Sequence, residues 1–61
     1  MTAFQRTINK ETHHITYYVD GKKVTNDKFY FIHNLRERQC GQYNSSLTTS
    51  DNKYIRHYYH I

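Results

Sequence analysis

The sequence predicts a small α+β domain, in which one helix packs on one face of a mainly antiparallel sheet in the order ββαββ. Three observations support this fold class: a capped helical segment in mid-chain, a two-residue hairpin signal before it, and alternating β-branched and aromatic segments at both ends. Sixty-one residues suffice for one domain, so we expect residues 1–61 to fold as a single unit.

The N-terminal part of the chain predicts two antiparallel strands joined by a polar turn. Thr2–Ile8 alternates weakly, with Phe4 and Ile8 on one side and polar residues on the other. His13–Val19 is a run of β-branched and aromatic residues, which favour strands. Alternation places three of its residues on the side toward the helix: Ile15, Tyr17 and Val19.

A hairpin is predicted at Asp20-Gly21, because this dipeptide suits a two-residue turn between alternating segments. The return arm, Lys22 to Val24, is too short for a full strand, since helix signals begin at the next residue. We therefore expect the chain to pass from the hairpin almost directly into the helix.

Thr25–Gly41 is the one segment whose sequence marks both ends of a helix. Thr25 suits the N-cap, Asp27 complements the positive end of the helix dipole, and Gly41 suits the left-handed residue that closes a helix. At 100° per residue, four apolar residues fall on one arc that we expect to face the sheet: Phe29, Phe31, Ile32 and Leu35.

The last third of the chain predicts two more strands around a turn at residues 50–52. Gln42–Thr49, in which Tyr43 and Leu47 share a face, is interpreted as an edge strand. Lys53–Ile61 is interpreted as the final strand. Three of its odd-numbered residues are expected to face the helix: Ile55, Tyr59 and Ile61.

One helix covers only one face of a sheet, so the other face directs the functional interpretation. By alternation, that face carries aromatic, basic and hydroxyl side chains: His14, Thr16, Tyr18, Tyr54, Arg56, Tyr58 and His60. Tyrosine and arginine are frequent at interface hot spots, which favours binding of a protein or a second copy. Exposed tyrosines with basic neighbours also hold single-stranded nucleic acid, and tyrosine is in addition a strand former that pairs across strands.

A secondary candidate surface is predicted on the helix flank away from the apolar arc and on the hairpin before it. We expect its residues to be exposed and to add polar and charged groups. The members are Tyr30, His33, Glu37, Lys22 and Lys23.

No catalytic, cofactor or metal site is predicted. His57 and His60 have the spacing of helical metal ligands, but on a strand they point to opposite faces. Cys40 lies at the C-terminal end of the helix, where the dipole disfavours a thiolate. The five acidic residues are scattered among turns and helix ends, so no paired-carboxylate site is expected.

The net charge and the length of the chain limit the kinds of partner that we expect. The formal net charge of +4 moderately favours an anionic partner, either nucleic acid or an acidic protein surface. A single cysteine excludes an internal disulfide, and no secretion signal or long apolar segment is present, so we expect a cytoplasmic protein without a membrane partner. A chain this short buries only about 60% of its unfolded surface, which favours a homodimer.

The composition also points to an origin. Asn, Lys, Ile, Tyr and Phe, which AT-rich codons encode, supply 25 of the 61 residues. This composition is typical of short reading frames of phages and other mobile elements, and also of small cellular proteins of AT-rich bacteria. In size and composition, though in no motif, the chain resembles the accessory proteins with which phages block host defences, such as anti-CRISPR proteins. We therefore predict a non-catalytic inhibitor that docks on and occludes a larger host protein or nucleoprotein complex. The alternatives are a nucleic-acid-binding module and a homodimeric accessory protein.

Overall fold

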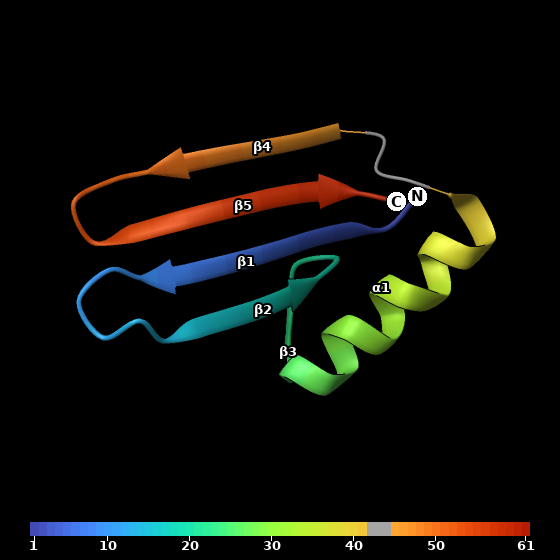
Figure 1. Ribbon diagram of the computed structural model, residues 1–61, viewed down its shortest axis with the longest axis horizontal. Coiled ribbons are helices and arrows are strands. Elements are labelled where there is room, and N and C mark those ends of the chain that lie inside the picture. Colours follow the sequence, from blue (N-terminus) through green and yellow to red (C-terminus); the bar gives the residue numbers. More distant parts are fainter. Residues whose placement is uncertain (42–44) are drawn as a thin grey trace.

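The computed structural model describes residues 1–41 and 45–61, and it contains one helix and five strands (Figure 1). The elements are β1 (Ala3–Asn9), β2 (Ile15–Val19), β3 (Lys22–Val24), α1 (Asn26–Cys40), β4 (Ser45–Ser50) and β5 (Tyr54–His60). The predicted α+β class, with one helix against an antiparallel sheet, is confirmed. The return arm of the hairpin is short, as expected, yet its three residues pair with β2 as a strand.

All five strands belong to one antiparallel sheet with the order β3-β2-β1-β5-β4. The first and last strands are therefore neighbours at its centre, and the two ends of the chain lie side by side in Figure 1. Thr2 and Ile61 exchange two backbone hydrogen bonds there, of 2.7 and 3.1 Å. Phe4 faces Val19 across one ladder and Tyr59 across the other.

The predicted ends of the helix are confirmed. The Thr25 hydroxyl accepts a hydrogen bond from the Lys28 N–H (3.2 Å), which satisfies one of the free donors of the first turn. At the other end Gly41 adopts φ +85° and donates its N–H to the Glu37 carbonyl (2.9 Å). The predicted hairpin is also present, with positive φ at both Asp20 and Gly21.

Predicted strand boundaries move by one or two residues, since β1 spans Ala3–Asn9 rather than Thr2–Ile8 and β5 spans Tyr54–His60 rather than Lys53–Ile61. β2 begins at Ile15 rather than at His13, because His13 has φ +62° and belongs to the turn. β4 is an edge strand, as predicted, and it is described from Ser45 onward. The predicted start at Gln42 and the orientation of Tyr43 lie outside the described residues.

The hydrophobic core lies between α1 and the half of the sheet nearest the chain ends. Phe4 stacks on Tyr59, with ring centroids 5.2 Å apart, and meets Phe29 edge-on at 5.5 Å. Val19 and Ile61 complete the buried cluster. The predicted orientation of Val19, Tyr59 and Ile61 toward the helix is confirmed.

The prediction for the buried side of α1 was partly wrong. Phe29 is 0% exposed, but Phe31 is 69% and Leu35 43% exposed. The inward stripe instead contains Phe29, Ile32 and His33, at the spacing i, i+3, i+4. The helix is thus turned by roughly a quarter turn from the predicted arc. His33 can face inward because the Tyr59 hydroxyl, 2.8 Å from its Nδ1 atom, satisfies the buried ring nitrogen.

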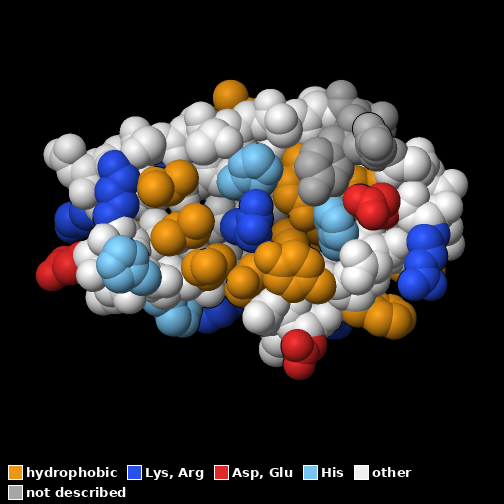
Figure 2. All heavy atoms as spheres, viewed as in Figure 1, with side chains coloured by type: hydrophobic (Ala, Val, Ile, Leu, Met, Phe, Trp, Pro, Cys, Tyr) orange, Lys and Arg blue, Asp and Glu red, His pale blue; other side chains and the backbone are white. Residues whose placement is uncertain are grey.

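The helix leaves the other half of this sheet face uncovered (Figure 1). There Ile8 lies opposite Ile15 on one neighbouring strand and Ile55 on the other, and all three side chains are partly exposed. Figure 2 looks onto this face and shows hydrophobic side chains gathered over the strand ends away from α1. The described part of the chain has no helix long and apolar enough to cross a membrane.

Candidate interaction surface on the open sheet face

We call the side of the sheet away from α1 the open face. Because cross-strand partners point to the same side, the strand register assigns its residues directly. One row crosses all five strands: Lys23, Tyr18, Gln5, Tyr58 and Leu47. The neighbouring row contains Thr16, Thr7, Arg56 and Thr49.

Six of the seven residues predicted for this surface lie on the open face. They are Thr16, Tyr18, Tyr54, Arg56, Tyr58 and His60, which alternate with helix-facing residues along β2 and β5. The seventh, His14, is exposed just before β2, where its carbonyl accepts a hydrogen bond from the Asn9 N–H (2.9 Å). It helps to line a hollow of about 590 Å³ beside Lys23 at the β2–β3 edge.

Two tyrosines flank the middle of the open face. Tyr18 and Tyr58 each lie directly opposite Gln5, so their strands are two inter-strand spacings apart, roughly 10 Å. The Gln5 amide donates to the Thr7 hydroxyl at 3.0 Å, which orients it along its own strand. Both rings remain partly exposed, and Leu47 beside Tyr58 is 60% exposed.

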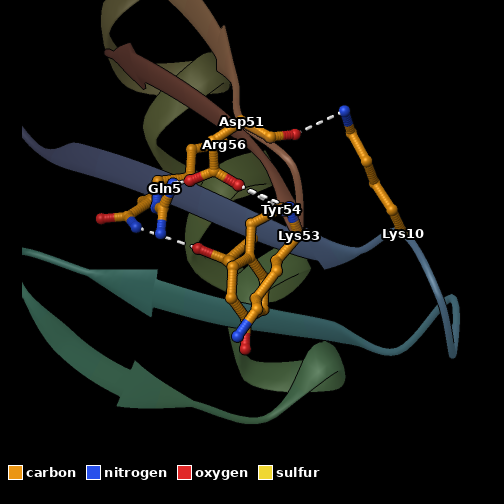
Figure 3. A network of polar contacts seen from close by, with 7 residues as sticks. Gln5, Lys10, Asp51, Lys53, Tyr54 and Arg56 are labelled. Carbon is orange, nitrogen blue, oxygen red and sulfur yellow. Dashed lines mark hydrogen bonds and ion pairs between the residues drawn. The ribbon is translucent and has the colours of Figure 1, made fainter.

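An ion pair closes the end of the face near the β4–β5 turn (Figure 3). The Arg56 guanidinium is 2.7 Å from the Asp51 carboxylate and lies over the Tyr54 ring, 5.2 Å from its centroid. The other Asp51 oxygen accepts the N–H groups of Lys53 (2.8 Å) and Tyr54 (2.7 Å). The Lys10 ammonium donates to the Asp51 carbonyl (2.6 Å), so the turn that follows β1 is joined to the β4–β5 turn.

These contacts set the electrostatics of the face. The hydrogen bond from Arg56, followed by those from the two backbone N–H groups, holds the pKa of Asp51 well below its ordinary value. The same contact raises the pKa of Arg56. Arg56 therefore stays charged but carries its counter-charge beside it, which weakens its attraction for a phosphate.

Histidines on the two sheet faces have separate surroundings. His60 lies on the open face with its Nδ1 atom 3.2 Å from the Ser45 hydroxyl. His57 lies on the helix side opposite Arg6, where burial and the Arg6 charge lower its pKa. The two rings point to opposite faces, as predicted. In residues 1–41 and 45–61, no group of three His, Cys, Asp or Glu side chains is placed to hold a metal ion.

The secondary surface does not form a single patch. His33, predicted to be exposed, is buried: its Nδ1 atom is 2.8 Å from the Tyr59 hydroxyl, and its Nε2 atom is 3.4 Å from the Glu37 carboxylate. Tyr30 remains partly open and packs on Tyr17, with centroids 5.8 Å apart. Lys23 belongs to the open face, whereas the adjacent Lys22 points to the helix side with its cross-strand partner Val19.

Lys22 and Lys23 therefore cannot act together on one surface. Five residues that the register places on the open face were missing from the predicted set: Gln5, Thr7, Leu47, Thr49 and Asp51. Gln5 alternates with Phe4, and Asp51 lies in a turn-forming triplet, but their positions beside Tyr58 and Arg56 depend on the strand order.

Comparisons with protein-family models, curated proteins and solved structures find no match for this chain. Its function therefore has to be inferred from the residues of the open face.

Proposed function

We propose that the chain is a small non-catalytic binding protein that docks its open face on a larger protein or nucleoprotein complex and occludes a site there. The observation that carries this proposal is the row from Lys23 to Leu47, which crosses all five strands and which no described helix or loop covers. Tyrosine side chains on such a rigid sheet give a large contact area at low entropic cost.

The size of the face suits this role. The two longer dimensions of the whole molecule, 36 and 22 Å, enclose a rectangle of roughly 800 Å², which is about the area that each partner buries in a standard-size interface, so docking would use most of the open face. A chain of 61 residues can therefore mask a site on a larger protein by steric occlusion alone.

A protein partner is favoured over nucleic acid by the charges of the face. Arg56 is balanced by Asp51, and the exposed apolar side chain of Leu47 continues the tyrosine row to the sheet edge. Nucleic-acid binding by Tyr18 and Tyr58 is the second candidate. It is supported by the position of the two rings on the strands that flank β1, with Lys23 directly opposite Tyr18.

The proposal is tested by affinity capture with a matched pair of variants. Tyr18→Ala/Tyr58→Ala removes both rings from the open face, whereas Phe31→Ala removes an exposed ring from the helix side. We expect the same protein to be recovered with the wild-type chain and Phe31→Ala, and to be lost with the double variant. Equal recovery with all three would refute the open face as the docking surface.

The two partner classes separate by salt dependence. With a generic single-stranded oligonucleotide in low salt, fluorescence anisotropy should give no appreciable binding if the face recognises protein. Binding that is appreciable, falls steeply as salt rises, and disappears in Tyr18→Ala/Tyr58→Ala would replace the protein proposal by the nucleic-acid one.

Composition and size suggest that the partner belongs to the host of a phage or mobile element, as for an anti-defence inhibitor. Expression of the chain should then raise the plating efficiency of a phage on a host that carries the targeted defence. Tyr18→Ala/Tyr58→Ala should abolish the increase while Phe31→Ala retains it. An increase that is insensitive to the double variant would contradict docking by this face.

A further inference from the structure

The two edges of the sheet differ in length and charge. β3 is three residues long and carries Lys22 and Lys23, and such short, charged strands protect a sheet from pairing with another chain. β4 is six residues long, its sequence SSLTTS contains no charge and no proline, and every residue is exposed. The β4 edge thus lacks the protection that the β3 edge has.

Backbone hydrogen bonds show which groups of β4 point away from the sheet. The Asp51 N–H donates to the Tyr54 carbonyl at 2.9 Å, and bonded pairs alternate along an antiparallel ladder from that point. The N–H and C=O groups that face β5 therefore belong to Ser45, Leu47 and Thr49. Those that point outward belong to Ser46, Thr48 and Ser50.

The same alternation leaves fewer backbone N–H and C=O groups unpaired at the opposite edge of the sheet, which β3 forms. The Asp20 N–H donates to the Ala3 carbonyl at 2.8 Å, so the even-numbered residues of β2 bond to β1 and the odd-numbered ones to β3. Lys23 of β3 then directs its backbone groups outward, and so does Ile15 of β2, which lies beyond the last residue paired with β3. The unpaired hydrogen-bonding capacity of the described sheet is concentrated at β4.

We propose that the β4 edge pairs antiparallel with β4 of a second copy of this chain, forming a two-fold dimer with one continuous ten-stranded sheet. With Thr48 opposite Thr48 of the second copy, Ser46 lies opposite Ser50, and every outward N–H and C=O of these three residues meets a partner. This register uses the whole exposed edge and leaves none of its backbone groups unpaired.

The side chains favour a second copy as the occupant of this edge. Each copy has a formal charge of +4, and β4 is a stretch over which two copies approach without bringing like charges together. Hydroxyl groups of Ser46, Thr48 and Ser50 meet on the helix side. On the open face Leu47 lies opposite Thr49 of the second copy, which covers part of its exposed surface.

The dimer goes beyond the proposed docking function and does not depend on it. A two-fold axis perpendicular to the sheet places both open faces on the same side, so the row that ends at Leu47 continues into the second copy. A single strand pair is a small interface, and the association is therefore expected to be weak and concentration-dependent.

Sedimentation velocity and light scattering over a wide concentration range test this inference. We expect the mass to rise toward twice the 7.5 kDa of one chain, and the amide protons of Ser46, Thr48 and Ser50 to exchange more slowly as it does. Ser46→Pro removes one outward N–H and should keep the chain monomeric. Lys23→Pro, the matched change at the other edge, should still dimerise.

A second variant keeps the test decisive if proline perturbs the fold. Thr48→Lys places two lysines opposite each other at the centre of the pairing and should abolish the dimer, whereas Asn34→Lys adds the same charge on the exposed side of α1 and should not. A chain that stays monomeric at millimolar concentration would overturn the proposal and leave the edge to a strand from another protein. A dimer that survives both Ser46→Pro and Thr48→Lys would also overturn it.

Discussion

Phe29 and Phe31 form a matched pair that tests which side of α1 is buried. The Phe29 ring has no exposed surface and lies 5.5 Å from the Phe4 ring and 5.0 Å from the Tyr17 ring, whereas Phe31 is largely exposed. Phe29→Ala should lower the free energy of unfolding by about 3–5 kcal/mol, through lost burial and a cavity. Phe31→Ala removes hydrated surface and should change the free energy by less than about 0.5 kcal/mol.

The small total stability of the domain decides which variants of Phe29 and Phe31 can be compared by unfolding. At about 0.05–0.15 kcal/mol per residue, a chain of this length has roughly 3–9 kcal/mol of stability, so Phe29→Ala removes between about a third and all of it. Phe29→Leu, with an expected loss of about 1.5 kcal/mol, keeps the chain folded enough for a urea titration followed by circular dichroism. A loss for Phe31→Ala equal to or larger than that for Phe29→Leu would refute the placement of the helix.

Three further predictions concern polar groups. Tyr59→Phe removes the hydroxyl that bonds His33 and should lower the unfolding free energy by about 1 kcal/mol in urea titration; no change would contradict the buried pair. Contacts with Arg56 and with backbone N–H groups depress the pKa of Asp51. They therefore stabilise the folded state at pH values above 3.8, the ordinary pKa, and this stabilisation is lost as the pH falls from 3.8 through the depressed pKa. The melting temperature of Asp51→Asn should therefore fall less on acidification than that of the wild type, and an equal fall would contradict the ion pair. Arg6 has a buried Nε atom with no hydrogen-bond partner in residues 1–41 and 45–61, and its other contact is a long hydrogen bond to the exposed Tyr30 hydroxyl (3.4 Å). Arg6→Met should therefore leave the melting temperature unchanged or raise it, and a clear fall would contradict the cost assigned to the buried Nε atom.

Local signals in the sequence were sufficient for the ends of the helix and for the hairpin. A threonine cap, a glycine with positive φ and an Asp-Gly turn each act within a few residues, so no knowledge of the fold is needed to place them. The buried side of α1 could not be predicted from local sequence in the same way. His33 faces inward because Tyr59, 26 positions later, supplies a hydrogen bond, and hydrophobic periodicity does not register such a partner.

The open face illustrates the same division between local and distant information. Alternation along β2 and β5 was enough to place Tyr18, Arg56 and Tyr58 on the side away from the helix. It did not place Gln5 between the two tyrosines, because that position follows from the pairing of β1 with the last strand. The edge role of β4 was predicted, whereas the outward direction of individual backbone groups required the ladder itself.

The central position of β1 has a consequence for how the domain folds. β1, β2 and β3 form a continuous meander and β4 with β5 a hairpin, so each half can form from contacts close in sequence. The ladder that joins the two halves pairs Phe4 with Tyr59 and so closes a loop of nearly the whole chain. Closing so long a loop costs chain entropy before any contact is gained, which slows folding. Until β5 is in place, β1 has an unpaired edge and Phe4 lacks the ring it stacks on. Assembly of this small domain is therefore expected to be limited by the meeting of its two ends.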